Sequence, residues 1–214
     1  MEALLQSVTQ YAEKTLGNEG FRYASVVVAN AKMLALQHET QMEETPEGER
    51  ETVDMEALVV AAYLHDISTP SQGFQQHNVA SAHMAADFLR GQGATPEFVQ
   101  KVEQAILTHM TPHAGEQRAI VSLEGRILYD ADKLGRLSGL AVVTSLIEFG
   151  ARYTNRTVTG DMLAAALRHI EERFIDLYQS LNTEPARDMA REKFNSTLAF
   201  LDGVIEHLSD ATPV

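Results

Sequence analysis

The chain of 214 residues is long enough to bury a substantial core, and its length fits a single domain. Its 30 acidic residues outnumber its 17 basic residues and give a formal charge of −13, which repels a phosphate backbone and argues against a nucleic-acid polymer as partner. The absence of cysteine excludes disulfides and thiolate zinc sites, so any metal must be bound by imidazole and carboxylate groups.

Apolar residues recur with helical spacing along nearly the whole chain, and no persistent alternation predicts a β-sheet. The expected fold is all-α, a single compact bundle that ends in two long helices. Met1 to Gln6 carry neither the basic segment nor the apolar core of a signal peptide, and no run is long enough to span a bilayer, so we expect a cytoplasmic protein with no membrane partner. The predicted helices cover residues 2–16, 22–38, 54–66, 78–90, 96–110, 118–134, 138–152, 161–181 and 185–208.

Local signals refine these expectations. The acidic stretch Glu39–Glu51 indicates a solvated loop. Thr95 is a good N-cap, since Pro and Glu follow it in the first turn. Residues 138–152 are apolar around much of the helix circumference, which predicts a central helix. The two amphipathic C-terminal helices, over residues 161–208, could pack on the core or form the seam of a homodimer.

Four ionisable side chains fall on apolar helix faces near helix ends. They are His65, Asp66, His109 and Asp130. Each is in line with apolar residues one or two turns earlier along its helix. A single buried His is more often a hydrogen-bonded core residue, and a single buried Asp is more often an ion-pair or capping partner. One shared metal site explains all four residues at a lower energetic cost than separate buried polar networks.

Two further histidines lie close to this group in sequence. His77 immediately precedes the predicted helix over residues 78–90. His113 lies beyond the predicted helix over residues 96–110, and the roles of metal ligand, substrate contact and surface residue are all open for it.

Several segments together resemble the HD-domain superfamily of metal-dependent phosphohydrolases over about residues 20–150. The matching segments are Ala61–Ile67, His77 with Ser81-Ala82 and Phe88-Leu89, Ile106–His109, and Ile127–Leu134. The resemblance implies one HD-like domain over residues 1–214. It implies that His65, Asp66 and Asp130 bind one metal ion, that His77 and His109 serve a second, and that Asp66 bridges the two.

The chain departs from this family at its first ligand. The segment that normally carries a histidine followed by Arg-Val has Tyr23 at the histidine position and Val26 at the arginine position. A phenol, with an ordinary pKa near 10, is a poor ligand for a hard divalent cation at neutral pH. Ser68-Thr69 replaces the Gly-Lys of the cyclic-dinucleotide phosphodiesterase branch, and the Gly-Tyr-Pro motif of that branch is absent. That substrate class is therefore not expected.

The resemblance implies hydrolysis of a small phosphorylated molecule, with nucleotides among the candidates. The expected cofactor is one or two divalent ions (Mn, Fe, Ni, Zn or Mg) that activate water and offset developing charge. Asp66 is the candidate to orient the attacking water, and Lys133 and Arg136 are either phosphate contacts or surface residues. The missing first histidine motivates a rival, a catalytically impaired regulatory module of the HD fold that binds a metal or a nucleotide. A purely structural bundle is disfavoured by the inward-facing acids.

Overall fold

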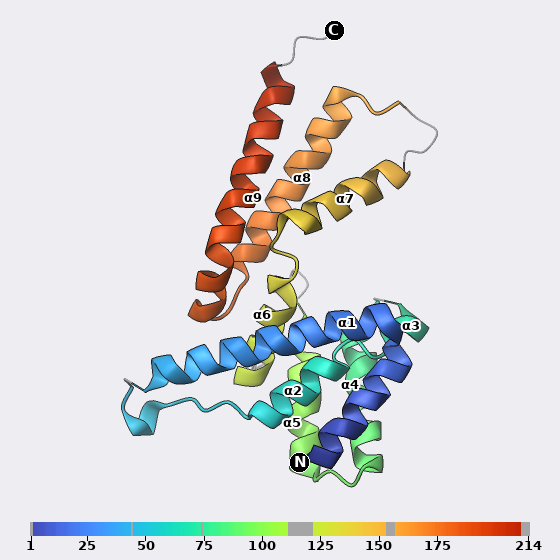
Figure 1. The fold of residues 1–214 in the computed structure, drawn as a ribbon, viewed down its shortest axis with the longest axis vertical. Coiled ribbons are helices and arrows are strands. Elements are labelled where there is room, and N and C mark those ends of the chain that lie inside the picture. Colours follow the sequence, from blue (N-terminus) through green and yellow to red (C-terminus); the bar gives the residue numbers. More distant parts are fainter. Residues whose placement is uncertain (1, 44, 74, 111–121, 153–156, 211–214) are drawn as a thin grey trace. The chain divides into compact units, whose positions relative to one another are not determined.

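The computed structural model describes residues 2–43, 45–73, 75–110, 122–152 and 157–210, and within these ranges the chain is all-α (Figure 1). The predicted fold class is confirmed. The elements are α1 (Glu2–Met42), η1 (Glu47–Glu49), α2 (Met55–Leu64), α3 (Thr69–Gln72), α4 (His77–Gly91), α5 (Pro96–Leu107), α6 (Leu123–Leu134), α7 (Gly139–Arg152), α8 (Gly160–Gln179) and α9 (Glu184–Asp210). No single described helix is long and apolar enough to cross a membrane.

The chain divides into two compact units, Met1–Asp132 and Lys133–Val214. The first unit contains α1 to α5 and most of α6, and the second contains α7, α8 and α9. The division falls inside the segment of about residues 20–150 that carries the predicted motifs. A single domain over the whole chain stays a prediction.

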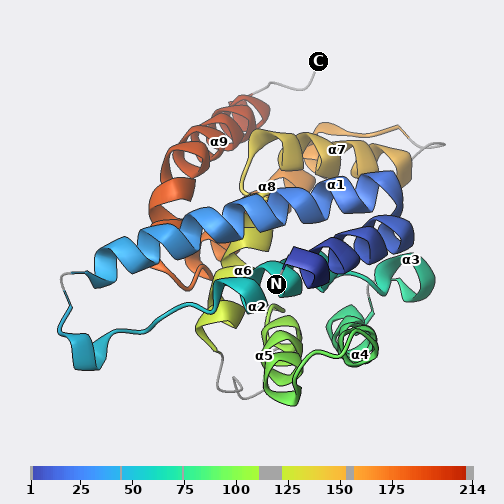
Figure 2. The same ribbon diagram turned by 60° about the horizontal axis from the view of Figure 1, so that its bottom comes forward.

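The core of the first unit is built around α2. Seven of the ten residues of this helix are buried, because its apolar residues cover the whole circumference rather than one face. Helices α1, α4 and α5 contact it, and Figure 2 shows α1 along one side of α2 with α4 and α5 on the other. Asp54 caps α2 by accepting a hydrogen bond from the Ala57 backbone NH, and it also pairs with Lys101 of α5 at 2.7 Å.

Helix α1 is broken at Gly17, where the chain leaves helical geometry with φ 68° and ψ 179°. The break separates the two N-terminal helices that the sequence predicts, and Figure 1 shows the two arms of α1 meeting at an angle near α3. This backbone region is accessible almost only to glycine. The two arms of α1 therefore depend on the absence of a side chain at residue 17.

Gly17→Ala is expected to lower the free energy of unfolding by about 1–2 kcal/mol, the cost of placing an alanine in a glycine-only conformation. A built Cβ at this position meets nothing within 4 Å, so conformational strain is the sole cause. Urea denaturation measures the change. Gly91→Ala in α4 is the matched control, since its Cβ also meets nothing and its φ is not positive. An equal loss in both variants would contradict the strain account.

The second unit packs α7, α8 and α9 around Val142, Leu167 and Leu201. Stacked aromatic rings also join α8 to α9, with Phe174 and Phe194 centroids 5.3 Å apart. The prediction that α7 is a central helix is wrong. Leu140 and Ile147 of α7 are 74% and 67% exposed, so this helix buries one face only. An apolar composition around a helix does not by itself supply partners for every face.

Candidate metal centre

His65 and Asp66 lie where α2 ends, and the following turn fixes their position. His65 is the C-cap residue of α2. The Ser68 hydroxyl donates to the backbone oxygen of His77 at 3.1 Å, and the Ser68 backbone NH donates to the Ser81 hydroxyl. The turn after α2 is thus bound to the start of α4, which brings His77 toward Asp66. His109 enters from the end of α5, two residues beyond Leu107.

The imidazoles surround the Asp66 carboxylate. His77 Nε2 lies 3.2 Å from Asp66 Oδ1, His109 Nε2 lies 3.9 Å from the same oxygen, and His65 Nε2 lies 3.4 Å from Oδ2. The ligand atoms of His65, Asp66 and His109 all lie within 4.8 Å of one another, and among the described residues this is the set with metal-binding geometry. His65 and His109 are each 1% exposed.

The other ring nitrogens determine which imidazole atoms can accept a metal. His65 Nδ1 lies 2.8 Å from the backbone oxygen of Ala62, and His109 Nδ1 lies 2.5 Å from that of Ile106. A carbonyl oxygen only accepts, so each Nδ1 must carry a proton. In a neutral imidazole this leaves Nε2 with a lone pair, which here faces a carboxylate oxygen. Two lone pairs in that position repel unless a cation lies between them.

Burial confirms that the contacts around Asp66 are incomplete. Within the described part of the chain, His65 Nε2 and Asp66 Oδ1 are buried and have no hydrogen-bond partner. His77 Nε2 lies 3.2 Å from Oδ1 but without hydrogen-bond geometry. Buried polar atoms without partners are costly and call for an explanation. Nitrogen and oxygen donors in this arrangement fit a divalent cation, so the residues present suit a metal ion.

The electrostatics of the group favour ligands in their metal-binding forms. Burial lowers the pKa of His109 to about 3, helped by the neighbouring His65, so His109 is neutral at physiological pH. Burial acts to raise the pKa of Asp66, but the close approach of His77 and the influence of His65 act against it. The net pKa of Asp66 is below its ordinary value, so Asp66 is ionised at neutral pH.

A second carboxylate, Asp132 of α6, also belongs to this region of the first unit. Its negative charge acts to raise the pKa of both Asp66 and His109, against the net lowering of each. The Tyr23 hydroxyl of α1 donates a hydrogen bond to Asp132 Oδ1. The sequence analysis did not select Asp132. The run Asp130-Ala131-Asp132 offers two acids, and only Asp130 falls on the apolar stripe of α6.

The structure brings together four of the predicted site residues, His65, Asp66, His77 and His109. Asp130 is fully buried. Because it lies two positions before Asp132 on the same helix, its side chain leaves α6 on nearly the opposite side from that of Asp132. Its role as a ligand stays a prediction.

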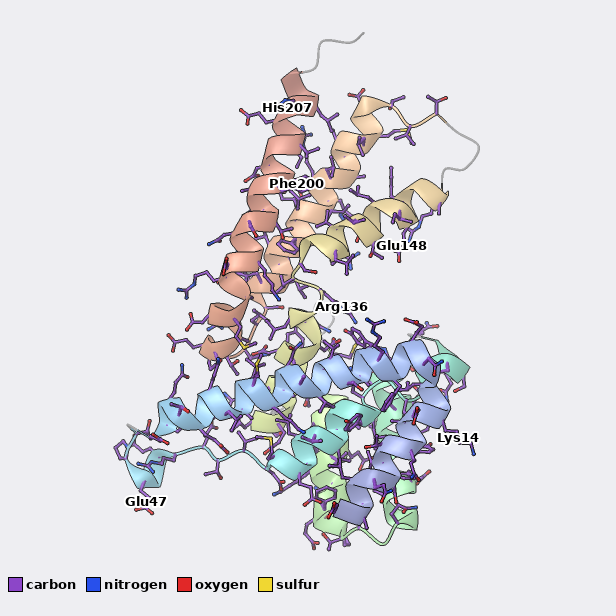
Figure 3. All side chains as sticks on the ribbon, viewed as in Figure 1. Lys14, Glu47, Arg136, Glu148, Phe200 and His207 are labelled. Atoms are coloured by element: carbon purple, nitrogen blue, oxygen red, sulfur yellow. The ribbon has the colours of Figure 1, made fainter. Side chains whose placement is uncertain are left out.

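The predicted phosphate contacts fall in the second unit of the chain. Lys133 and Arg136 belong to the second unit, where Figure 3 labels Arg136 just after α6. Their role as substrate contacts stays a prediction. His113 lies outside the described residues.

A family model described as HD domain matches residues 27–137, just over half of the chain. A curated relative, the uncharacterized protein YpgQ of Bacillus subtilis, is 25% identical over 156 residues, which cover 72% of this chain and 73% of YpgQ.

Solved structures share the fold over nearly the whole chain. The crystal structure of B. subtilis YpgQ in complex with ADP matches with a TM-score of 0.66 and 21% identity, and covers 96% of each chain. A protein of Lactobacillus plantarum matches with a TM-score of 0.70 and 18% identity over 99% of each chain. The Lin1889 protein of Listeria innocua matches with a TM-score of 0.66 and 16% identity, over 99% of this chain and 98% of its own.

Proposed function

Since the chain belongs to the HD-domain family, we propose that it is a metal-dependent phosphohydrolase that acts on a small phosphorylated molecule. One observation carries the proposal. Lone pairs on His65 Nε2 and His109 Nε2 face the Asp66 carboxylate, whose Oδ1 is buried, and a cation is the partner that suits both kinds of atom. Without an ion, these buried polar atoms would lack partners and would only destabilise the folded chain.

In this proposal His65, Asp66 and His109 hold the ion, and His77 is the fourth candidate ligand. Asp132 adds negative charge nearby, and Asp130 stays a candidate from the sequence. A divalent ion bound there would activate water and offset the negative charge that develops on a phosphoryl group. A set rich in imidazole suits Zn²⁺, Ni²⁺, Fe²⁺ or Mn²⁺, and magnesium less well.

Residues of the chain itself would orient the attacking water and the metal-binding imidazoles. Asp66 is ionised at neutral pH and can accept a hydrogen bond from the attacking water, which sets the direction of attack. The backbone oxygens of Ala62 and Ile106 fix the rings of His65 and His109, so these imidazoles need no reorganisation during the reaction. A nucleoside diphosphate is the leading substrate candidate, supported by the relative that was crystallised with ADP.

Hydrolysis by the full chain tests the proposal. We expect phosphate release from at least one member of a panel of nucleoside mono-, di- and triphosphates and simple phosphate esters, and only with Mn²⁺, Fe²⁺, Ni²⁺ or Zn²⁺ present. His109→Ala is expected to reduce the rate on the order of a hundredfold or more, because it removes a ligand. His83→Ala is the matched control, since His83 is an exposed histidine of α4. Chromatography of the nucleotides and a phosphate assay give the rates.

A regulatory module is the second candidate, and one observation favours it. The sequence resemblance aligns Tyr23 with the first family histidine, and in the structure the Tyr23 hydroxyl donates a hydrogen bond to Asp132. Tight binding of metal and nucleotide by calorimetry, with no turnover across the panel, would support this candidate against the enzyme. Absence of metal binding would exclude both.

A further inference from the structure

Side chains cap the C-terminal end of α5, the helix that leads to His109. The last four carbonyl oxygens of a helix lack their usual partners, so other groups must satisfy them. In α5 the Thr108 hydroxyl lies 2.8 Å from the first of these oxygens and 3.4 Å from the second. His109 Nδ1 donates to the third, the oxygen of Ile106, at 2.5 Å. The fourth oxygen, that of Leu107, has its partner on a different helix.

An asparagine of α4 completes this cap. Asn78 Nδ2 donates to the backbone oxygen of Leu107 at 3.0 Å. Because a carbonyl oxygen only accepts, the amide must present its nitrogen to it. Asn78 directly follows His77 in sequence, and Leu107 lies two residues before His109. The amide therefore joins the two segments that carry these imidazoles to the Asp66 carboxylate.

His77 depends on such contacts, because the chain just before it does not favour the start of α4. The N-cap residue, Gln76, makes no capping hydrogen bond with its side chain and has a left-handed backbone, with φ 54° and ψ 28°. This conformation is uncommon for a residue other than glycine. The Ser68 hydroxyl holds the backbone oxygen of His77 from the turn after α2. Asn78 supplies a second restraint, from the end of α5.

We infer that Asn78 is a positioning residue that holds His77 at the Asp66 carboxylate by tying the first turn of α4 to the end of α5. The inference rests on the proposed metal centre, in which His77 is the fourth candidate ligand. His77 Nε2 and His109 Nε2 lie 3.2 and 3.9 Å from Asp66 Oδ1, and their ring centroids are 5.5 Å apart. An ion among these groups requires that this spacing be kept. Groups that orient metal ligands contribute about tenfold or more to metal affinity.

Asn78→Leu tests the inference because leucine is close to asparagine in size and its side chain donates no hydrogen bond. We expect Ni²⁺ to bind the full-length variant about tenfold more weakly. In a His77→Ala background the same substitution should leave Ni²⁺ affinity nearly unchanged, because the ligand through which Asn78 acts is gone. The loss of Tm in the metal-free protein should, by contrast, be present in both backgrounds. Isothermal titration calorimetry on protein stripped of metal and thermal denaturation give the two readouts.

Asn30→Leu is the matched control. The Asn30 amide of α1 donates the same kind of bond to the backbone oxygen of Ala131, in the last turn of α6, at 3.1 Å. Because this bond does not involve α4, its effect on Ni²⁺ affinity should be the same with and without His77→Ala. Asn78→Ala, which suits a helix, repeats the test in case Asn78→Leu does not fold.

Equal Ni²⁺ affinities of the natural protein and Asn78→Leu would overturn the inference and leave the metal centre in place. Unchanged affinity in His77→Ala alone would overturn it as well, since His77 would not be a ligand. A loss that is equally large in the His77→Ala background would overturn it too, because Asn78 would then act by another route. If the natural protein binds neither Ni²⁺ nor Mn²⁺, the proposed metal centre fails and the inference fails with it.

Discussion

Asp66→Asn is expected to weaken Ni²⁺ binding about a thousandfold, or ~4 kcal/mol, as is typical when one charged partner is removed from a buried set. The asparagine keeps the size of the side chain but loses the negative charge that all three imidazoles approach. It also turns one acceptor into an NH₂ group, which would point hydrogen atoms at the site of the ion. Calorimetry on protein stripped of metal measures the affinity.

Asp87→Asn in α4 is the matched control for this variant. Its side chain is 80% exposed and pairs with Arg90 on the surface, so metal affinity should be unchanged. Equal affinities for natural protein and Asp66→Asn would show that the carboxylate is not a ligand, and the metal centre would have to be withdrawn.

Acidification of the metal-free protein is expected to remove stability between pH 6.5 and pH 3 through His109. The pKa of this side chain is about 3 in the folded chain and 6.5 when unfolded, so the unfolded state binds more protons in this window. Stability is therefore fully present above pH 6.5 and declines as the pH falls. The loss between pH 7 and pH 4.5 should be about 3 kcal/mol from this residue.

Urea denaturation at the two pH values, with a chelator present, measures this loss. His109→Gln should remove most of it, because glutamine does not titrate. Asp66 does not interfere, since its pKa is lowered and its contribution is lost only below its ordinary value of 3.8. His83→Gln, at an exposed position, should leave the pH profile unchanged. A profile of the His109→Gln protein that matches the natural one would contradict the assignment of a buried neutral imidazole.

The sequence predicted most of the first unit because its information there is local. Capping residues such as Thr95 and apolar spacing along α2 act over a few positions, and the structure confirms both elements. Short motifs around His65 and His109 carried the family resemblance, and the family match confirms it. Helix positions also predicted that these two histidines face inward, as they do.

What the sequence did not predict depends on contacts between distant residues. Tyr23 and Asp132 are 109 positions apart, and no periodic pattern reveals their hydrogen bond. The apolar stripe of α6 predicted that Asp130 is buried, which the structure confirms, but it gave no reason to consider Asp132. The sequence also failed to predict the exposed face of α7, because the burial of a helix face depends on which neighbouring element it contacts.

The directions of the helices that reach Asp66 have an electrical consequence. Helix α2 ends at Leu64 and α5 ends at Leu107, so both present the negative end of the helix dipole to the centre, while α4 begins there at His77 and offsets part of this field. Each such end adds about half a negative charge beside Asp66. A phosphorylated compound that approaches the metal-free centre therefore meets repulsion from the backbone itself. For the proposed phosphohydrolase we therefore expect the cation to bind before the phosphorylated compound, because the directions of these helices leave the metal-free centre negative.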